Sequence, residues 1–153
     1  MEIRSEHRMS RIITVVVLVT AVGLASLGMF GCQSYTTGLQ KTRAGANVTA
    51  VIGALQTTAG AQRSYAMSHD GDYGTFKQLS EDGFLDARFN SDAPEVQGYV
   101  LTMNVGEKTF SCNADPGASI EAPAKHFYID STNTQVHVNP DQPATADDPP
   151  LKP

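Results

Sequence analysis

Apolar residues along this chain follow three patterns, each typical of a different kind of element. Residues 12–31 form a continuous run without a charged side chain. Residues 44–67 carry apolar side chains at helical spacing, and from residue 98 onward apolar and polar positions alternate. These patterns predict a membrane-directed segment, an amphipathic helix and a set of β-strands, in that order along the chain.

The helical pattern predicts one helix from about Ala44 to Met67. No proline interrupts it, and polar residues supply its other side. A second, short helix is expected over 75–85, with Thr75 as its cap and Gly83 near its end. Gly and Asp residues predict a loop over 68–74. The apolar positions of the first helix are Val48, Val51, Ile52, Leu55, Ala59 and Ala66, with Gln62 among them.

The alternating pattern predicts three strands, at 98–105, 108–114 and 126–130, with a fourth, short strand at 135–138. Gly106 and Glu107 are expected to form a tight hairpin turn between the first two strands. The stretch 139–153 holds five of the eight prolines and has no apolar period, so it is predicted to be disordered. The predicted fold class is α+β, with one long N-terminal helix packed on a three- to four-stranded antiparallel sheet.

The uncharged run predicts a membrane-directed leader. It is twenty residues long, follows three arginines (Arg4, Arg8 and Arg11) and ends at Cys32. A signal-peptide core has about 7 to 15 apolar residues and a spanning helix about 20, so length alone leaves both a signal peptide and an uncleaved signal anchor open. The basic amino-terminal flank predicts that everything after residue 32 is extracytoplasmic.

The residues at the end of the run resemble a bacterial lipoprotein signal. Such signals place small or aliphatic residues before a cysteine, which is lipidated before the leader is removed. Here Gly31 fits the position before the cut, while Met29 and Phe30 depart from the pattern. The resemblance implies lipidation of Cys32, and several acyl chains on one cysteine would anchor the protein firmly. The uncleaved anchor remains the alternative.

The predicted organisation is a leader or anchor at 1–31, a polar tether at 32–43, one folded domain at 44–138 and the tail at 139–153. Residues 32–153 are 122 in number, which suits a single domain. They carry 8 Lys and Arg against 14 Asp and Glu. Nucleic-acid binding needs a basic face, so this composition argues against nucleic acid as a partner.

The two cysteines, Cys32 and Cys112, could form one disulfide in an oxidising compartment. Lipidation of Cys32 would remove that possibility and leave Cys112 as a lone thiol within a predicted strand. A small buried apolar role is then the simplest expectation for Cys112.

Candidates for catalysis or metal binding are few. The four histidines are scattered, and no serine or cysteine nucleophile has an adjacent base, so no catalytic residues are assigned and the protein is not expected to be an enzyme. His126 and His137 could face each other across the last hairpin, but the expected state of both is solvated.

One loop carries a group of metal-ligand types. Asp70, Asp72 and Glu81 match positions 1, 3 and 12 of a calcium loop, but Gly74 and Thr75 stand where an oxygen ligand and the obligatory glycine belong. An EF-hand is therefore excluded. No cofactor is expected, and a weak calcium site using Asp70, Asp72 or Asp92 is the remaining metal alternative.

Several stretches together resemble the globular part of bacterial type IV pilin-like proteins and pseudopilins. They lie within 47–138 and read AVIGALQTTAGAQRSYAMSHDGDYGTFKQL, GYVLTM, KTFSCNADP and KHFYIDSTNTQV. The resemblance implies a pilin-like head domain of the α+β class. It also implies that a loop near the sheet could hold calcium, as in some pseudopilin heads.

The chain departs from that family where filaments assemble. A prepilin keeps its apolar segment after cleavage, whereas cleavage before Cys32 would remove it, and Thr36 stands where the family has a glutamate. The expected function is that of a non-enzymatic, membrane-anchored extracytoplasmic protein. Its partners would be the membrane and components of the cell envelope or of a secretion or pilus system. The alternative function is a small-ligand or metal-binding module.

Overall fold

A computed structural model describes residues 31–120 and 123–152, with side chains from residue 45 onward. The chain divides into two units, Met1–Ala44 and Gly45–Pro153, and the second unit holds the sheet and the core. The predicted run at 12–31 therefore lies almost wholly outside the described residues. Among the residues described, no helix is both long and apolar enough to cross a membrane.

Two helices and one 3-10 turn precede the sheet. Helix α2 spans Gly31–Ser68, helix α3 spans Phe76–Glu81, and η1 spans Ala87–Phe89. Helix α3 begins at the predicted cap, because the Thr75 hydroxyl accepts a hydrogen bond from the Gln78 amide and the Gln78 side chain accepts one from Thr75. Residues 31–44 are helical, where a tether at 32–43 was expected.

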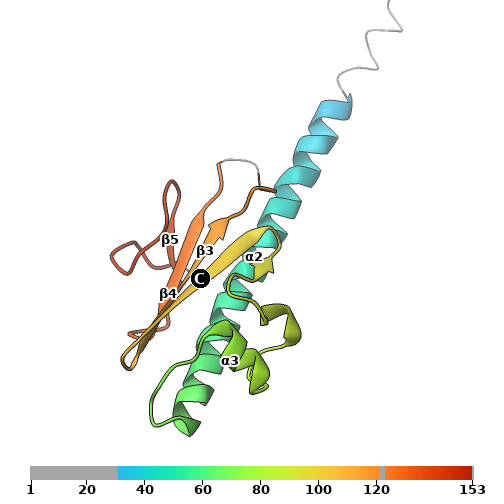
Figure 1. The fold of residues 1–153 in the computed structure, drawn as a ribbon. Helices are drawn as coiled ribbons and strands as arrows, with labels where there is room; N and C mark the ends of the chain where they lie inside the picture. The colour runs from blue at the N-terminus through green and yellow to red at the C-terminus, as the bar shows by residue number, and fades with distance from the viewer. Residues whose placement is uncertain (1–30, 121–122, 153) are drawn as a thin grey trace, which may run out of the picture. The chain divides into compact units, whose positions relative to one another are not determined.

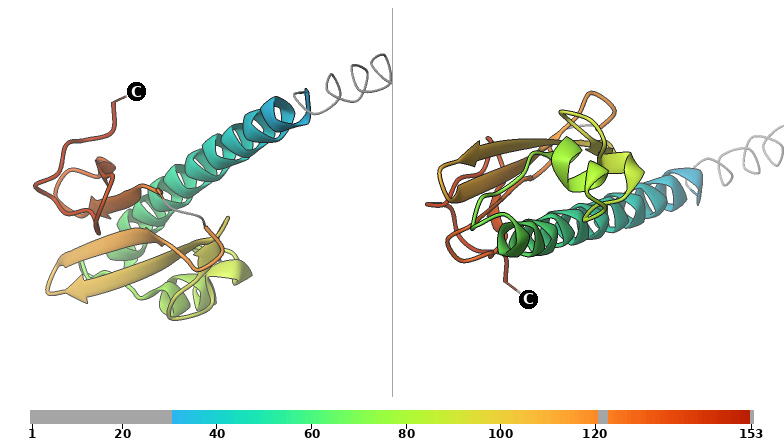
Figure 2. Two further views of the ribbon diagram at one scale, coloured as in Figure 1. Left: turned by 90° about the horizontal axis from the view of Figure 1, so that it is seen from above. Right: turned by 60° about the horizontal axis from the view of Figure 1, so that its bottom comes forward.

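The sheet is antiparallel and its strands follow one another in sequence order. They are β1 (Glu95–Val96), β2 (Tyr99–Gly106), β3 (Thr109–Pro116), β4 (His126–Asp130) and β5 (His137–Asn139). Figure 1 shows the 45–68 part of α2 running along the sheet, and both views in Figure 2 place α3 and the C-terminal segment on opposite sides of the sheet.

The predicted fold class is wrong in its strand number and in its helix. The sheet has five strands rather than three or four, and the helix of the folded unit covers only residues 45–68 instead of forming a long N-terminal helix. The additional strand, β1, has two residues, too few to show an alternating pattern. It pairs with β2 because Gln97 and Gly98, both at positive φ, form a two-residue turn.

The core lies between α2 and one face of the sheet. Val51 and Leu55 from the helix pack in one cluster with Leu101 and Ile129 from the strands, and all four are fully buried. Phe127 belongs to this cluster while Tyr128 points to the opposite face, which settles the orientation that alternation alone left open. We call the side of the sheet away from α2 the outer face.

The tail differs from its predicted disorder. Residues 139–152 fold back on the sheet: Ala144 is 1% exposed, and its carbonyl accepts a hydrogen bond from the Asn113 side chain at 2.8 Å. The Leu151 amide donates to the Val136 carbonyl and the Val138 amide donates to the Pro149 carbonyl, so the segment also lines the free edge of β5. A proline-rich, polar stretch can be ordered by such specific hydrogen bonds although it has no apolar period.

Candidate functional site

The loop after α2 is held in place by a buried glutamine. Gln62 is fully buried, and its side-chain amide donates to the Gly74 carbonyl at 2.6 Å while its oxygen accepts from the Gly74 amide at 3.0 Å. A Cβ atom at residue 74 would lie 3.1 Å from Cζ of Tyr65, so glycine is the residue that fits there. The loop therefore has a fixed path at the point where it leaves the helix.

Two of the three candidate metal carboxylates, Asp72 in this loop and Asp92 after η1, are paired with lysines. Lys108, in the turn between β2 and β3, places its ammonium 2.9 Å from the Asp72 carboxylate and 2.6 Å from the Asp70 carbonyl. Asp92 is paired with Lys77 at 2.9 Å. A cation at the Asp72 or Asp92 carboxylate would therefore compete with a lysine ammonium, whereas the Asp70 carboxylate has no lysine partner among the described residues. Within 31–120 and 123–152, no three metal-ligand side chains are grouped around a common point.

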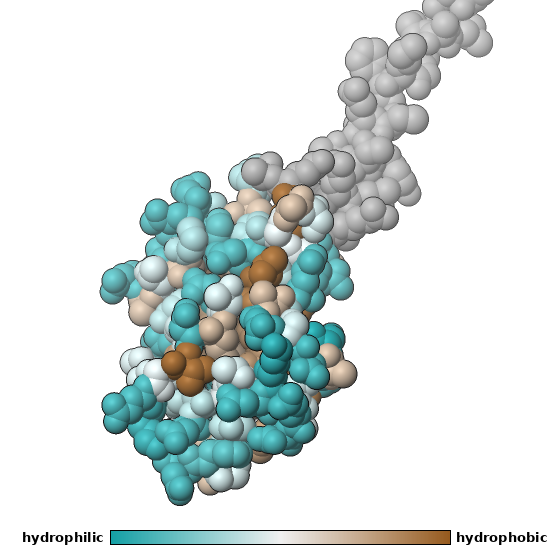
Figure 3. Space-filling model, in the orientation of Figure 1, coloured by the Kyte–Doolittle hydropathy of each residue, from teal (hydrophilic) through white to brown (hydrophobic). Residues whose placement is uncertain are grey.

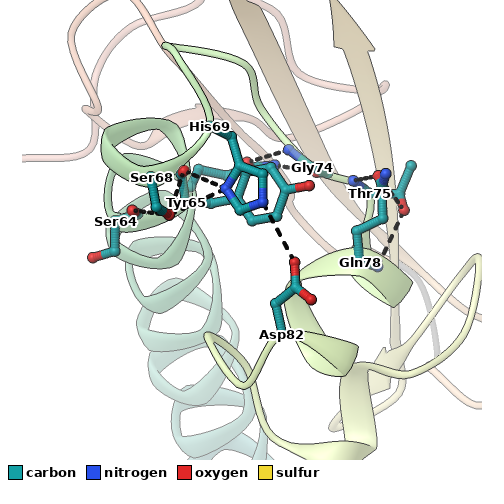
Figure 4. A network of polar contacts seen from close by, with 9 residues as sticks. Ser64, Tyr65, Ser68, His69, Gly74, Thr75, Gln78 and Asp82 are labelled. Carbon is teal, nitrogen blue, oxygen red and sulfur yellow. Dashed lines mark hydrogen bonds and ion pairs between the residues drawn. The ribbon is translucent and has the colours of Figure 1, made fainter.

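A serine, a histidine and an aspartate do meet beside this loop, as Figure 4 shows. The Ser68 hydroxyl lies 3.1 Å from Nδ1 of His69, and Nε2 of His69 lies 3.7 Å from the Asp82 carboxylate. The His69 ring also stacks on the ring of Tyr65, with 3.7 Å between the ring centroids. The residue types are those of a hydrolase triad, which the sequence did not suggest because Asp82 lies beyond α3.

The hydrogen bonds of this group argue against that chemistry. Nδ1 of His69 is 2.9 Å from the Tyr65 carbonyl, which can only accept, so Nδ1 carries the proton and cannot remove one from Ser68. The Ser68 hydroxyl lies 3.0 Å from the same carbonyl and can donate its own proton there. Ser68 and His69 hydrogen-bond the Tyr65 carbonyl near the C-terminal end of α2, and they do not form an activated nucleophile.

The two other histidines lie on the outer face, and each has its own partner. Nδ1 of His126 is 2.6 Å from the Asp115 carboxylate, and Nδ1 of His137 is 2.6 Å from the Asp148 carbonyl. His137 pairs with Tyr128 across the β4–β5 hairpin, whereas His126 pairs with Asn139. The two histidines share a face, but the prediction that both are solvated is wrong, because His137 is buried and His126 is half-buried. The tail supplies the partner of His137 and β3 that of His126.

A shallow hollow of about 330 Å³ adjoins His126. Its walls are mostly proline and small side chains, and Asp141 from the tail also lines it. Its residues are Pro116, Gly117, Ile120, Pro123, Ala124, His126, Pro140 and Asp141. Most of this hollow comes from the loop after β3 and from the tail, two segments in which the sequence suggested no site.

Cys112 is fully buried in β3 and is a free cysteine. Burial raises the pKa of its thiol to about 12, and the charge of Asp115 acts in the same direction. The thiol is therefore neutral at physiological pH and acts as a small apolar side chain, as expected for this position. The side chain of Cys32, the predicted lipidation site, lies outside the described side chains.

Comparisons of the chain with protein-family models, with curated proteins and with solved structures gave no match.

Proposed function

We propose that this chain is a non-enzymatic, membrane-anchored extracytoplasmic protein whose folded unit serves as an interaction or structural component of the bacterial cell envelope or of a secretion or pilus system. One observation carries the proposal. The lysines, histidines and carboxylates that are candidates for catalysis or metal binding instead contact one another or the backbone and join two segments of the chain. The pairs are Lys108 with Asp72, Lys77 with Asp92, His126 with Asp115, and His137 with the Asp148 carbonyl.

The contacts within these pairs favour a binding role over catalysis. Three of these pairs tie a loop, a turn or the tail to a neighbouring element, and the pair of His126 and Asp115 joins β4 to β3. These contacts fix the positions of the surface loops, and a fixed surface loses less conformational entropy when it binds a partner. The same pairings give no support to the alternative of a calcium module in the 68–74 loop, because Asp72 already has a cationic partner.

The anchor rests on the sequence. The basic flank, the uncharged run at 12–31 and Cys32 favour a lipid anchor on the extracytoplasmic side, with an uncleaved signal anchor as the alternative. The resemblance to type IV pilin-like proteins supports a role among envelope or secretion components through its motifs alone.

The intact mass of the protein extracted from bacterial membranes tests the anchor. We expect a chain that begins at Cys32 and carries acyl mass, while Cys32→Ala should accumulate as the full precursor. A wild-type chain that keeps residues 1–31 would replace the lipid anchor with a signal anchor.

The interaction role is tested by crosslinking in intact cells followed by purification in detergent. We expect envelope or secretion proteins among the crosslinked products, at positions on the folded unit. Recovery of the monomer alone at every position tried would overturn this part of the proposal.

A further inference from the structure

Strand β2 has an open edge beyond its pairing with β1. The hairpin turn at 97–98 closes on the pair Val96 and Tyr99, so the backbone of Tyr99 points toward β1. Alternation then directs the backbone groups of Leu101, Met103 and Val105 to the same side. The Leu101 amide donates to the Pro94 carbonyl at 2.9 Å, which confirms this direction. Strand β1 ends there, and within the described residues Met103 and Val105 have no backbone partner on that side.

The opposite edge of the sheet is covered. The free side of β5 pairs with 149–151, and two of those three residues are prolines, which cannot donate a hydrogen bond to a further strand. Natural sheets protect their edges in this way. The chain therefore blocks one edge with its own tail and leaves about five residues of the other, 102–106, available for pairing.

The open edge is accessible and has acidic residues at both ends. Thr102, Asn104 and Gly106 are exposed, and Val105 is one of two large apolar side chains exposed among the described residues, at 40%. Glu95 and Glu107 flank the segment. Both are exposed, and neither forms an ion pair with another described residue. Figure 3 shows a largely hydrophilic face with small, separate hydrophobic areas.

We propose that the edge of β2 over 102–106 binds an extended segment of another protein as an added strand, and that this segment carries Lys or Arg near both of its ends. Main-chain hydrogen bonds to Met103 and Val105 would supply affinity, and an apolar side chain on the α2 side of the sheet would cover Val105. Glu95 and Glu107 would select the basic ends. The inference deepens the proposed function and rests on it.

A second copy of this chain fits the edge poorly. Antiparallel pairing of 102–106 with itself sets Met103 against Val105 of the other copy and Glu107 against Leu101 of the other copy. Glu95 lies close to Leu101 because it pairs with Val100, so Glu107 of one copy would lie near Glu95 of the other. Like charges would then meet at both ends of the contact. A basic partner strand avoids this repulsion.

The test uses the full chain in detergent and a heptapeptide of alternating Val and Thr with Lys at both ends. We expect binding that slows hydrogen exchange at the amides of Met103 and Val105, measured by NMR. A peptide with Glu at both ends should bind about tenfold more weakly. A Lys peptide N-methylated on the side that faces β2 should not bind.

Variants of the protein complete the test. Val105→Pro removes one outward donor without touching the β3 ladder, and Glu95→Gln with Glu107→Gln removes the charges; both should weaken binding of the Lys peptide. Glu81→Gln, an exposed change on α3, is the matched control and should leave affinity unchanged.

Three results would overturn the proposal. They are equal affinity for the Lys and Glu peptides, protection at β5 instead of β2, and protection of Met103 and Val105 through self-association without peptide. The N-methylated peptide arm uses the wild-type chain, so it remains decisive if a variant does not fold. Because the anchor is tested by mass on extracted protein and the edge by peptide binding, failure of one is distinguishable from failure of the other.

Discussion

The side-chain amide of Gln62 and the backbone of Gly74 form two hydrogen bonds with each other, in the same way as two paired strands. Both groups are buried, and Nε2 of Gln62 also lies 2.8 Å from the sulfur of Met103. One helical side chain thus links α2, the following loop and β2. Replacing it leaves a peptide group without partners in the interior.

Gln62→Leu should therefore destabilise the folded unit strongly. The Gly74 amide and carbonyl would each lose their partner, and a buried unsatisfied group costs about 1 to 3 kcal/mol. We expect a loss of about 2 to 4 kcal/mol in the free energy of unfolding, measured by urea denaturation. Gln56→Leu, the same change at an exposed position of α2, is the control and should change stability by less than about 0.5 kcal/mol.

Thr58→Val should stabilise the protein. The Thr58 hydroxyl is fully buried and has no hydrogen-bond partner, so a methyl group of the same shape removes a desolvation cost without opening a cavity. We expect a gain of about 1 kcal/mol in the free energy of unfolding, or about 4 °C in melting temperature for a unit of this size. Thr57→Val serves as the matched control, because Thr57 is exposed and donates to the Gly53 carbonyl. An equal gain in the free energy of unfolding in both variants would mean that valine does not stabilise the protein by removing the unpaired Thr58 hydroxyl.

The helix and the long strands could be predicted from the sequence because each carries its own period. The described helix ends at Ser68, one residue after the predicted end, and β2, β3 and β4 cover most of the predicted ranges. Strand β1 could not be predicted, since two residues have no period. The order of the tail could not be predicted either, because it depends on single hydrogen bonds such as that from Asn113 to the Ala144 carbonyl, 31 residues apart in the chain.

The contacts of the candidate site also could not be predicted from the sequence pattern. Composition identified the acidic loop at 68–74 as a possible cation site, but it could not show that Lys108 would reach across from the β2–β3 turn, 36 residues from Asp72. Nor did the pattern reveal the role of Gln62, although a glutamine on the apolar stripe of a helix is a signal that a buried polar partner exists. Contacts of long sequence separation decide both cases.

Calcium should not change the stability of the protein. Asp72 and Asp92 are each paired with a lysine ammonium, so a cation bound at either carboxylate would compete with Lys108 or Lys77. We expect the melting temperature measured by scanning calorimetry to be the same with millimolar calcium and with a chelator. A rise of several degrees with calcium would instead support the metal-binding alternative, and Lys108→Met would then be expected to enlarge it.

Acid should loosen the tail before it unfolds the domain. The backbone amide of Thr145 is the main cause that lowers the pKa of the Asp148 carboxyl, and the Asn139 side chain, the Thr145 hydroxyl and the charge of His137 also lower it. Because the pKa is lower in the folded chain, the stabilisation is complete above the unfolded value of about 3.9 and is lost as the pH falls through the folded value.

The tail can be followed through the amides of Val138 and Leu151, whose hydrogen bonds join it to β5. We expect their exchange protection to fall in the acid range before that of core amides such as Leu101. Asp148→Asn should weaken the tail at neutral pH and remove this acid step. Asp147→Asn, at an exposed neighbour without a hydrogen bond in the described structure, should keep the acid step.

Cys112 should be unreactive in the folded protein and reactive once it unfolds. With a thiol pKa of about 12, only about one molecule in ten thousand carries the thiolate at pH 8, and the sulfur is also fully buried. An aromatic disulfide reagent added to the Cys32→Ala chain should therefore label no thiol under native conditions and one thiol in guanidinium chloride. Labelling that depends on global unfolding should slow further in Thr58→Val and speed up in Gln62→Leu, because these changes alter the population of the unfolded chain. Rapid labelling of the native protein, independent of these substitutions, would mean that β3 opens locally and exposes the Cys112 thiol without global unfolding.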